Sequence, residues 1–240
     1  MIQENVLVIS AHAVDFVWRC SGTIASYAAK GHKVKIVDIT FGQRGESNDV
    51  WKKNKEITEE EVIAIRKKEA EAAAKVLGAE IEFLHLTDHL LELTRDNKLE
   101  LAKIMKEFQP GIILTHFTSD PLNYDHPETA HATLSALRAA QVWGVNPGLK
   151  TVQGAKVFMF EPDQPEFCGF NPDTFIDITE VMELKKKAMD ICASQEYLVK
   201  NYTSRAEHRA YLAQRISGNN GIQYAEAFKR FNPYVGKAFA

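Results

Sequence analysis

The sequence predicts one α/β domain with a Rossmann-like, mostly parallel sheet that carries helices on both faces. Short apolar runs alternate with amphipathic segments along the chain, which is the pattern of repeated strand–helix–strand units. The first unit has apolar runs at 5–10 (NVLVIS) and 33–40 (KVKIVDIT), separated by a helical segment at 21–30. Parallel strands of this kind are joined by right-handed crossovers, which place helices against the faces of the sheet.

The later elements are predicted from their start and stop signals. A helix over 58–77 begins with the capping-box pair Thr58 and Glu61 and ends before a glycine. Pro127 lies in the first turn of a helix that runs to about Gln141. Further helices are expected over 97–107 and 181–200, and further strands over 80–86, 111–117, 156–162 and 175–180.

The length of the chain fits this single domain. The sequence has 240 residues, of which 45% are hydrophobic and 25% charged, as in a globular protein with a sizeable core. We assign residues 1–240 to one domain, with 201–240 as a C-terminal extension. Helical content in the extension is interrupted by a Gly-Asn-Asn-Gly break at 218–221.

The charge and the cysteine count exclude several classes of protein. The net charge is −3 and no basic block is present, so nucleic acid is not the expected partner. The first apolar run is too short to span a membrane and has no positively charged segment before it, which excludes a membrane anchor and a signal peptide. Three widely spaced cysteines predict a cytoplasmic protein without disulfide bonds.

Polar residues collect where the predicted strands end. His12 and Asp15 follow the first strand, the segment 42–47 follows the second, the segment 116–126 follows the fourth, and Glu161 follows the fifth. Ligands of parallel α/β sheets bind beyond the carboxyl ends of the strands. We therefore expect the functional site at this one edge of the sheet.

Three of these residues are candidate metal ligands. His12 and Asp15 lie three residues apart with only Ala13 and Val14 between them, and His126 lies at the start of a predicted helix. Two histidines, one carboxylate and an open position are typical of a catalytic zinc site, although such donors also accept iron or manganese. A single histidine at a strand end can equally serve as a hydrogen-bonding residue, so it is the combination that favours Zn2+.

Several motifs together resemble the LmbE/PIG-L family over roughly residues 5–200. These motifs read AHAVD, IRKKEAEAAAKVLGAE, YDH and IDITEV followed by ASQ. The family consists largely of zinc-dependent N-deacetylases with an α/β fold. The resemblance implies that His12, Asp15 and His126 are the zinc ligands.

The chain departs from the deacetylase pattern at the positions that perform hydrolysis. The family reads AHPDD, in which the first aspartate is the general base, whereas this chain has Val14 there, and valine cannot accept a proton. The family histidine of HPDH is replaced by Asn123, and the HxSQ motif begins with Cys192. The resemblance therefore implies a retained metal site with an altered catalytic apparatus.

A narrower resemblance accounts for these departures. The segments AHAVDFVWR, FGQRGES, NYDHPETAH and FEPDQPEFC resemble the 4-oxalomesaconate hydratase branch of the family. This resemblance implies a hydratase that adds water to a small tricarboxylate, giving 4-carboxy-4-hydroxy-2-oxoadipate in bacterial gallate and protocatechuate breakdown. It also suggests a homo-oligomer.

Hydration requires a group that polarises the substrate, a base for water, an acid for carbon and cations for the carboxylates. The candidate catalytic residues are Glu46, Asn123 and His131, and the candidate substrate-binding residues are Arg44, Arg19, Ser47 and Arg66. Several of these residues have a simpler alternative. The loop with Glu46 fits a solvated turn, Arg66 fits a surface pair with Glu69, and His131 fits a structural residue.

Two other functions remain open from the sequence. The chain fits a zinc-dependent N-deacetylase of an N-acetylated sugar conjugate in which Glu46 or another carboxylate replaces the missing base. It also fits a metal-binding or ligand-binding protein without catalysis. A hydratase predicts a pocket with arginines for several anions, whereas a sugar deacetylase predicts aromatic and hydrogen-bonding groups around a neutral ring.

Overall fold

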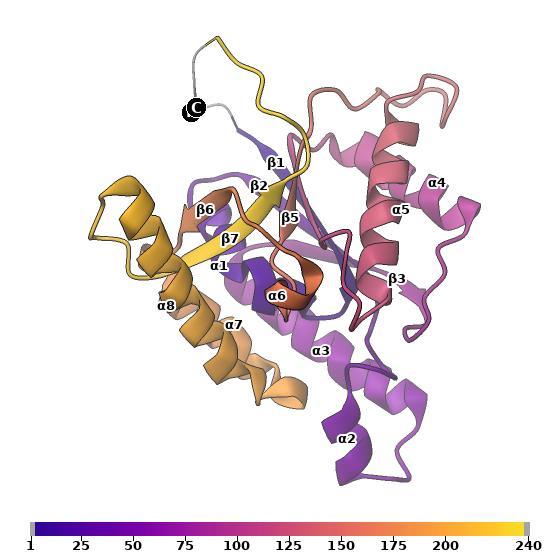
Figure 1. Ribbon diagram of the computed structural model, residues 1–240. Helices are drawn as coiled ribbons and strands as arrows, with labels where there is room; N and C mark the ends of the chain where they lie inside the picture. Colours follow the sequence, from indigo (N-terminus) through magenta and orange to yellow (C-terminus); the bar gives the residue numbers. More distant parts are fainter. Residues whose placement is uncertain (1–2, 238–240) are drawn as a thin grey trace.

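The computed structural model describes residues 3–237 and confirms the predicted fold class (Figure 1). Seven strands form one sheet in the order β3-β2-β1-β4-β5-β7-β6. The first five strands are parallel, and β7 is antiparallel to both β5 and β6. The strands are β1 (Asn5–His12), β2 (Lys33–Thr40), β3 (Glu80–Leu86), β4 (Ile112–Thr115), β5 (Lys156–Phe160), β6 (Thr174–Asp177) and β7 (Ala225–Arg230).

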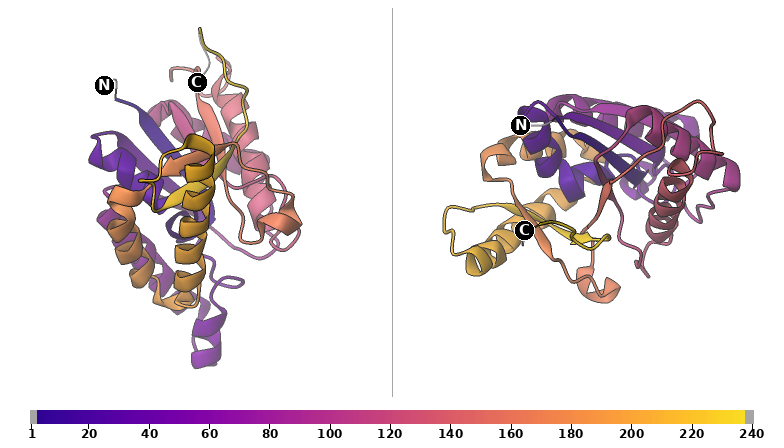
Figure 2. Two further views of the ribbon diagram at one scale, coloured as in Figure 1. Left: turned by 60° about the vertical axis from the view of Figure 1, so that its left-hand side comes forward. Right: turned by 90° about the horizontal axis from the view of Figure 1, so that it is seen from above.

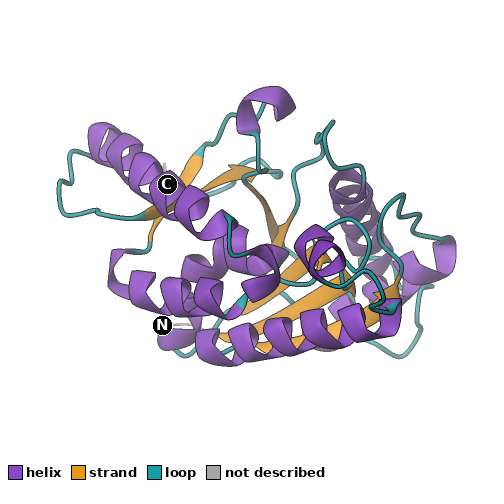
Figure 3. Ribbon diagram, turned by 90° about the horizontal axis from the view of Figure 1, so that it is seen from below, coloured by secondary structure: helices purple, strands orange, loops and turns teal. Residues whose placement is uncertain are grey.

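Helices cover both faces of the sheet (Figure 3). Side chains of β1 alternate between the faces: Val6 and Val8 pack against α1, α3 and α7, whereas Leu7 and Ile9 pack against α4 and α5. The helices are α1 (Asp15–Ala29), α2 (Asn48–Lys53), α3 (Glu59–Leu77), α4 (Arg95–Phe108), α5 (Asp125–Ala140), α6 (Pro165–Cys168), α7 (Met182–Ile191) and α8 (Leu198–Ser217), with short 3-10 turns η1 (Thr179–Val181) and η2 (Ala193–Gln195).

The capping signals of α3 act as predicted. The Thr58 hydroxyl accepts the Glu61 N–H at 3.2 Å, and the Glu61 carboxylate accepts the Thr58 N–H at 2.8 Å. Gly78 ends the helix with a left-handed φ of 76°. None of the helices in the described part of the chain is long and apolar enough to cross a membrane.

The predicted continuous helix over 181–200 is wrong. Helix α7 ends at Ile191, and α8 begins only at Leu198, after the η2 turn. In that turn the backbone N–H and hydroxyl of Ser194 donate to the Glu69 carboxylate at 2.9 and 2.5 Å. This contact with α3 takes the place of helical hydrogen bonds. It joins residues 125 positions apart, so the local sequence pattern does not predict it.

The C-terminal segment adds a strand that the sequence pattern did not predict. Helix α8 ends at Gly218, which has a φ of 73°, so the predicted break is confirmed. Strand β7 then returns between β5 and β6, and Figure 2 shows these orange and yellow segments along one side of the molecule. Glu226 of β7 is only 5% exposed, so a charged residue occupies a buried position. The segment therefore lacks the alternation of apolar and polar residues from which a strand is predicted.

Helix α1 starts six residues before the predicted segment and is broken at Cys20, where φ is −147°. Glu226 closes one side of the break, because its carboxylate accepts the N–H groups of Gly22 and Thr23 at 2.9 and 2.8 Å. Lys185 closes the other side by donating to the Trp18 carbonyl at 2.9 Å, and it pairs with Glu226 at 2.7 Å. The two side chains therefore satisfy backbone N–H and carbonyl groups at the break.

Candidate active site

The three predicted metal ligands lie together at the carboxyl edge of the sheet. His12 ends β1, Asp15 begins α1, and His126 lies in the first turn of α5. Asp15 Oδ2 lies 3.1 Å from His12 Nδ1 and 3.7 Å from His126 Nε2. Val14 has a left-handed φ of 69°, which is rare for a β-branched residue. This tight turn brings Asp15 back to accept the His12 backbone N–H at 3.0 Å.

Each histidine presents one ring nitrogen to Asp15 and the other to a second carboxylate. His12 Nε2 lies 3.0 Å from Asp125 Oδ2, and His126 Nδ1 lies 2.8 Å from Asp120 Oδ2. These carboxylates can only accept hydrogen bonds when ionised, which assigns the ring protons to the nitrogens that face them. His12 Nδ1 and His126 Nε2 are the nitrogens that would present lone pairs to a cation bound beside Asp15.

This arrangement suits a bound cation. His126 Nε2 is buried and has no hydrogen-bond partner within residues 3–237. Burial alone would lower the pKa of His12, but Asp15 and Asp125 hold that pKa well above its usual range. Burial would raise the pKa of Asp15, but His126 and His12 hold it well below its usual range. The three ligand atoms lie within 4.8 Å of one another, and two imidazoles with one carboxylate fit zinc.

A second group of possible ligands shares His12 with Asp88 and Asp125. Both carboxylates are already used by backbone donors. Asp88 accepts the two N–H groups of residues 44–45 at 2.9 and 2.6 Å, and Asp125 accepts two N–H groups from residues 89–91 at 2.7 and 2.9 Å. These carboxylates therefore fix loops around the site, and the first group fits a metal better.

His116 forms a wall of the site. Its ring stacks on the ring of His126 with centroids 4.2 Å apart. Burial, together with neighbouring His126, holds the pKa of His116 well below its usual range. Its Nε2 accepts the Ala11 N–H at 2.9 Å, as expected of a neutral imidazole.

The predicted base candidate Glu46 reaches the site from the loop after β2. Asn123 donates to Glu46 Oε1 at 2.8 Å, and Gln195 donates to Glu46 Oε2 at 3.0 Å. Gly42 allows the close approach of this loop to β1. It has a φ of 65°, and a Cβ there would lie 2.9 Å from Glu46 Cβ and 3.1 Å from His12 Cβ.

Two cavities meet at the contact between Glu46 and Asn123, since both residues line each of them. The first, which we call the Arg19 cavity, has a volume of about 260 Å³ and also contains Asp15, Arg19 and His126. The second, which we call the Arg44 cavity, has a volume of about 570 Å³ and also contains His12, Arg44, His89 and Asp125. The predicted ligands and the predicted base thus border a common space.

Two predicted substrate-binding residues line these cavities. Arg19 is 7% exposed, donates to the Glu161 carbonyl at 3.0 Å, and lies 3.6 Å from Asp15 Oδ1. Its Nε has no hydrogen-bond partner among the described residues. Arg44 is more open: its side chain is 53% exposed and pairs with Glu59 at 3.1 Å. Arg44 is therefore open to an anion from solvent, and the Arg19 side chain borders the smaller cavity.

Three other predicted residues border neither cavity. Arg66 is fully buried and its guanidinium contacts protein groups, so it supports the site from behind. Ser47 is fully buried, and its hydroxyl donates to the Gly42 carbonyl at 2.7 Å. His131 is exposed and does not line either cavity. It follows His126 by five residues, about 500° at roughly 100° per residue, so the two residues point to different sides of α5.

Three residues contact the site without being among the residues predicted for it, namely Asp120, Asp125 and Gln195. Both aspartates lie within six residues of His126 in the segment 116–126, so their position in the sequence could have predicted that they lie near the site. Gln195 is the last residue of the ASQ motif, but no contact with the site was expected because the motif lay inside a segment predicted to be continuous helix.

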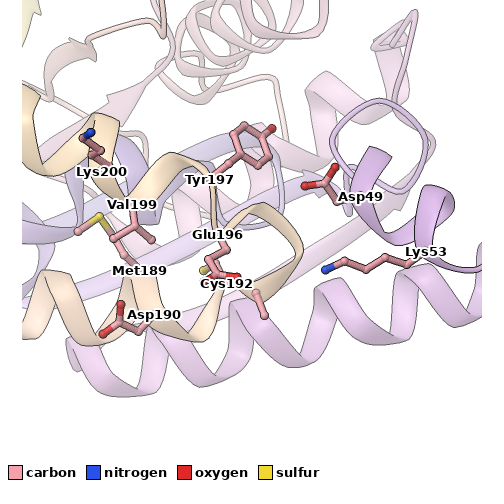
Figure 4. Close-up of a pocket in the computed structure, with 10 residues that line it drawn as sticks. Asp49, Lys53, Met189, Asp190, Cys192, Glu196, Tyr197, Val199 and Lys200 are labelled. Atoms are coloured by element: carbon pink, nitrogen blue, oxygen red, sulfur yellow. The ribbon is translucent and has the colours of Figure 1, made fainter.

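A larger cavity of about 870 Å³ lies between α2 and the start of α8 (Figure 4). Charged side chains of both signs border it, namely Asp49, Lys53, Asp190, Glu196 and Lys200. It contains none of the predicted site residues, so the candidate active site remains the space around Glu46.

Proteins of known name are similar to this chain in sequence. The family model described as PIG-L: GlcNAc-PI de-N-acetylase matches residues 7–137. A protein of Pseudomonas putida KT2440 named 4-oxalmesaconate hydratase is 42% identical over 99% of this chain and 93% of its own length.

Two solved structures are also similar. The crystal structure of GalB, the 4-carboxy-2-hydroxymuconate hydratase of Pseudomonas putida KT2440, has a TM-score of 0.95 at 41% identity, covering 99% of this chain and 100% of that one. An N,N'-diacetylchitobiose deacetylase of Pyrococcus horikoshii has a TM-score of 0.78 at 25% identity, covering 96% and 84%. The chain therefore belongs to the PIG-L family, and over its whole length it is similar to a hydratase of that family.

Proposed function

We propose that this protein is a metal-dependent hydratase that adds water to 4-oxalomesaconate and yields 4-carboxy-4-hydroxy-2-oxoadipate. The observation that carries the proposal is the Glu46 carboxylate, which Asn123 and Gln195 hold at the space bordered by the three metal-ligand candidates. The similarity to hydratases over nearly the full chain supports the same reaction class.

The two hydratase names describe one carbon skeleton, because 4-carboxy-2-hydroxymuconate is the enol form of 4-oxalomesaconate. Both double-bond carbons bear a carboxylate, and hydration adds the water oxygen to the one without a hydrogen and a proton to the neighbouring CH carbon. One proton of the water passes to a base. The product has the same charge as the substrate, so the site must neutralise three carboxylates throughout the reaction.

The residues around the two cavities can divide these tasks. Glu46 accepts the proton of water, since its carboxylate is the candidate base that borders both cavities. Asn123, which donates to Glu46, orients it and borders the same space. Arg19 and Arg44 supply cations for carboxylates, one in each cavity.

His12, Asp15 and His126 would hold a Zn2+ ion, as the unpartnered His126 Nε2 and the two assigned imidazole tautomers indicate. Bound zinc would supply a Lewis acid that polarises an oxygen of the substrate. Asp125 and Asp120 keep the two imidazoles in the orientation that presents the required lone pairs.

An N-deacetylase is the second candidate, and one observation favours it. A carboxylate at Glu46 is suited to activate water for attack on an amide as well as on an alkene. The arginine in each cavity favours an anionic substrate over a neutral sugar, so we rank the hydratase first.

We also propose a cytoplasmic homo-oligomer that acts in aromatic compound degradation, organised as one domain with a C-terminal extension. All three cysteines are free and buried, which fits a reducing compartment. Size-exclusion chromatography with light scattering tests the oligomeric state.

The first experiment follows the ultraviolet absorbance of 4-oxalomesaconate after addition of zinc-loaded protein, with His12→Ala as the matched variant. We expect a rapid decrease that the variant abolishes and that a chelator removes from the wild type. A wild-type protein that binds zinc and leaves the absorbance unchanged would exclude the hydratase, and N-acetylated sugars would be assayed next.

A further inference from the structure

We infer that Gln195 is a positioning residue that holds Glu46 in place as the base, an inference that rests on the proposed function. Gln195 is 3% exposed and lies in the η2 turn between α7 and α8. Its Nε2 donates to Glu46 Oε2 at 3.0 Å, while Asn123 Nδ2 donates to Glu46 Oε1 at 2.8 Å. Both carboxylate oxygens are therefore fixed by amide donors from two different parts of the chain.

The orientation of the Gln195 amide follows from its other partners. Its Oε1 lies 3.0 Å from Arg66 Nη1 and 3.2 Å from Trp18 Nε1. A guanidinium and an indole N–H can only donate hydrogen bonds, so the oxygen of the amide must face them. The amide NH2 must then face Glu46, and a flipped amide would oppose donors to donors.

Arg66 is itself held rigidly. Its guanidinium donates to the Phe41 carbonyl at 3.0 Å, to the Ser194 hydroxyl at 2.7 Å and to the Ala13 carbonyl at 2.5 Å. Ala13 lies between the ligand candidates His12 and Asp15. One buried guanidinium thus supports both the ligand loop and Gln195, which sets the position of the base relative to the metal site.

The hydrogen bond from Gln195 matters because this chain has Val14 at the position where the deacetylase pattern has its base, so that Glu46 is the candidate base. Val14 is fully buried and has no group that can accept a proton. Glu46 enters from a different loop and is only half-buried, so its side chain has more freedom than a residue in the ligand turn. Two amide donors match an ionised carboxylate and remove that freedom.

The test compares Gln195→Glu and Gln195→Met with the wild type and with Gln153→Met, an exposed glutamine before β5. Gln195→Glu keeps the acceptor for Arg66 and Trp18, replaces the donor to Glu46 by a carboxylate oxygen and adds a like charge beside Glu46, whereas Gln195→Met removes the donor without adding charge. We expect both Gln195 variants to lower kcat by about 10- to 100-fold, with KM within about 3-fold of the wild type. Zinc content should be unchanged, and Gln153→Met should behave as the wild type.

Crystal structures of the wild type and Gln195→Met provide the second readout, in which we expect the Glu46 carboxylate to leave its position beside Asn123. Unchanged kcat, or a Glu46 that stays in place, would overturn the inference. A loss of zinc together with activity would also overturn it, because Gln195 would then support the metal site. An inactive wild type with a displaced Glu46 in the variant would reject the hydratase reaction and retain the positioning role.

Discussion

The Asp125 carboxylate joins the imidazole of His12 to the neighbouring loop. Asp125 Oδ2 lies 3.0 Å from His12 Nε2, and the two carboxylate oxygens also accept the backbone N–H groups of His89 and Leu91 at 2.7 and 2.9 Å. His89 and Leu90 have left-handed φ values of 65° and 70°, which is an unusual backbone for such residues. The Asp125 side chain therefore stabilises a strained loop and also fixes the orientation of the candidate ligand His12.

Replacing Asp125 by asparagine is expected to weaken zinc binding by about 10- to 100-fold. Asparagine keeps the size of the side chain and loses the charge that fixes the proton on His12 Nε2. Competition with a chromophoric chelator measures the affinity. Asp96→Asn is the control, because the Asp96 side chain is 92% exposed on α4. An affinity equal to that of the wild type would contradict the assigned role of Asp125.

Glu46→Gln is expected to lower kcat for hydration by about 10²- to 10⁴-fold, since the amide cannot accept the proton of water. Steady-state assays measure kcat, and atomic absorption checks that zinc content is unchanged. Glu56→Gln, at an exposed position between α2 and α3, should leave both values unchanged. Retained activity in the Glu46 variant would require another base.

Arg19→Met should raise KM for the tricarboxylate by about 10- to 100-fold, which corresponds to about 1.4–2.8 kcal/mol and fits the loss of a hydrogen bond to a charged group. Methionine retains much of the buried stem and removes the guanidinium. The exposed Arg138 on α5 offers the control Arg138→Met. Equal KM values for the two variants would exclude Arg19 as a carboxylate-binding residue.

Lys185→Met is expected to destabilise the protein by about 3–5 kcal/mol, because it leaves the Glu226 carboxylate buried without its cation. Lys185 is 1% exposed and Glu226 is 5% exposed, so water cannot replace the pair. Denaturant-induced unfolding measures the change in free energy. Lys187→Met alters a nearby exposed lysine of the same helix and should leave the midpoint unchanged. Equal midpoints for the two variants would show that the pair does not stabilise the break in α1.

The sequence was most informative where a local signal defines the structure. Thr58 and Glu61 predicted the start of α3 because a capping box needs only residues three apart. His12, Asp15 and His126 were predicted as neighbours because strand ends of a parallel sheet share one edge. His131 was a candidate for the site, but it lies away from the cavities because successive residues of a helix point in different directions. Arg66 was a candidate for binding substrate, but it is buried by contacts with residues outside α3.

The sequence by itself determined the fold class, the edge of the sheet that carries the site and the three metal-ligand candidates, since periodicity, caps and strand ends are properties of short segments. Only the tertiary structure decided the partners of these residues. His12 meets Asp125 across 113 positions of sequence, and Glu46 meets Gln195 across 149. Contacts at such separations depend on how α5, η2 and the loops pack around the sheet, and no local sequence pattern encodes that packing.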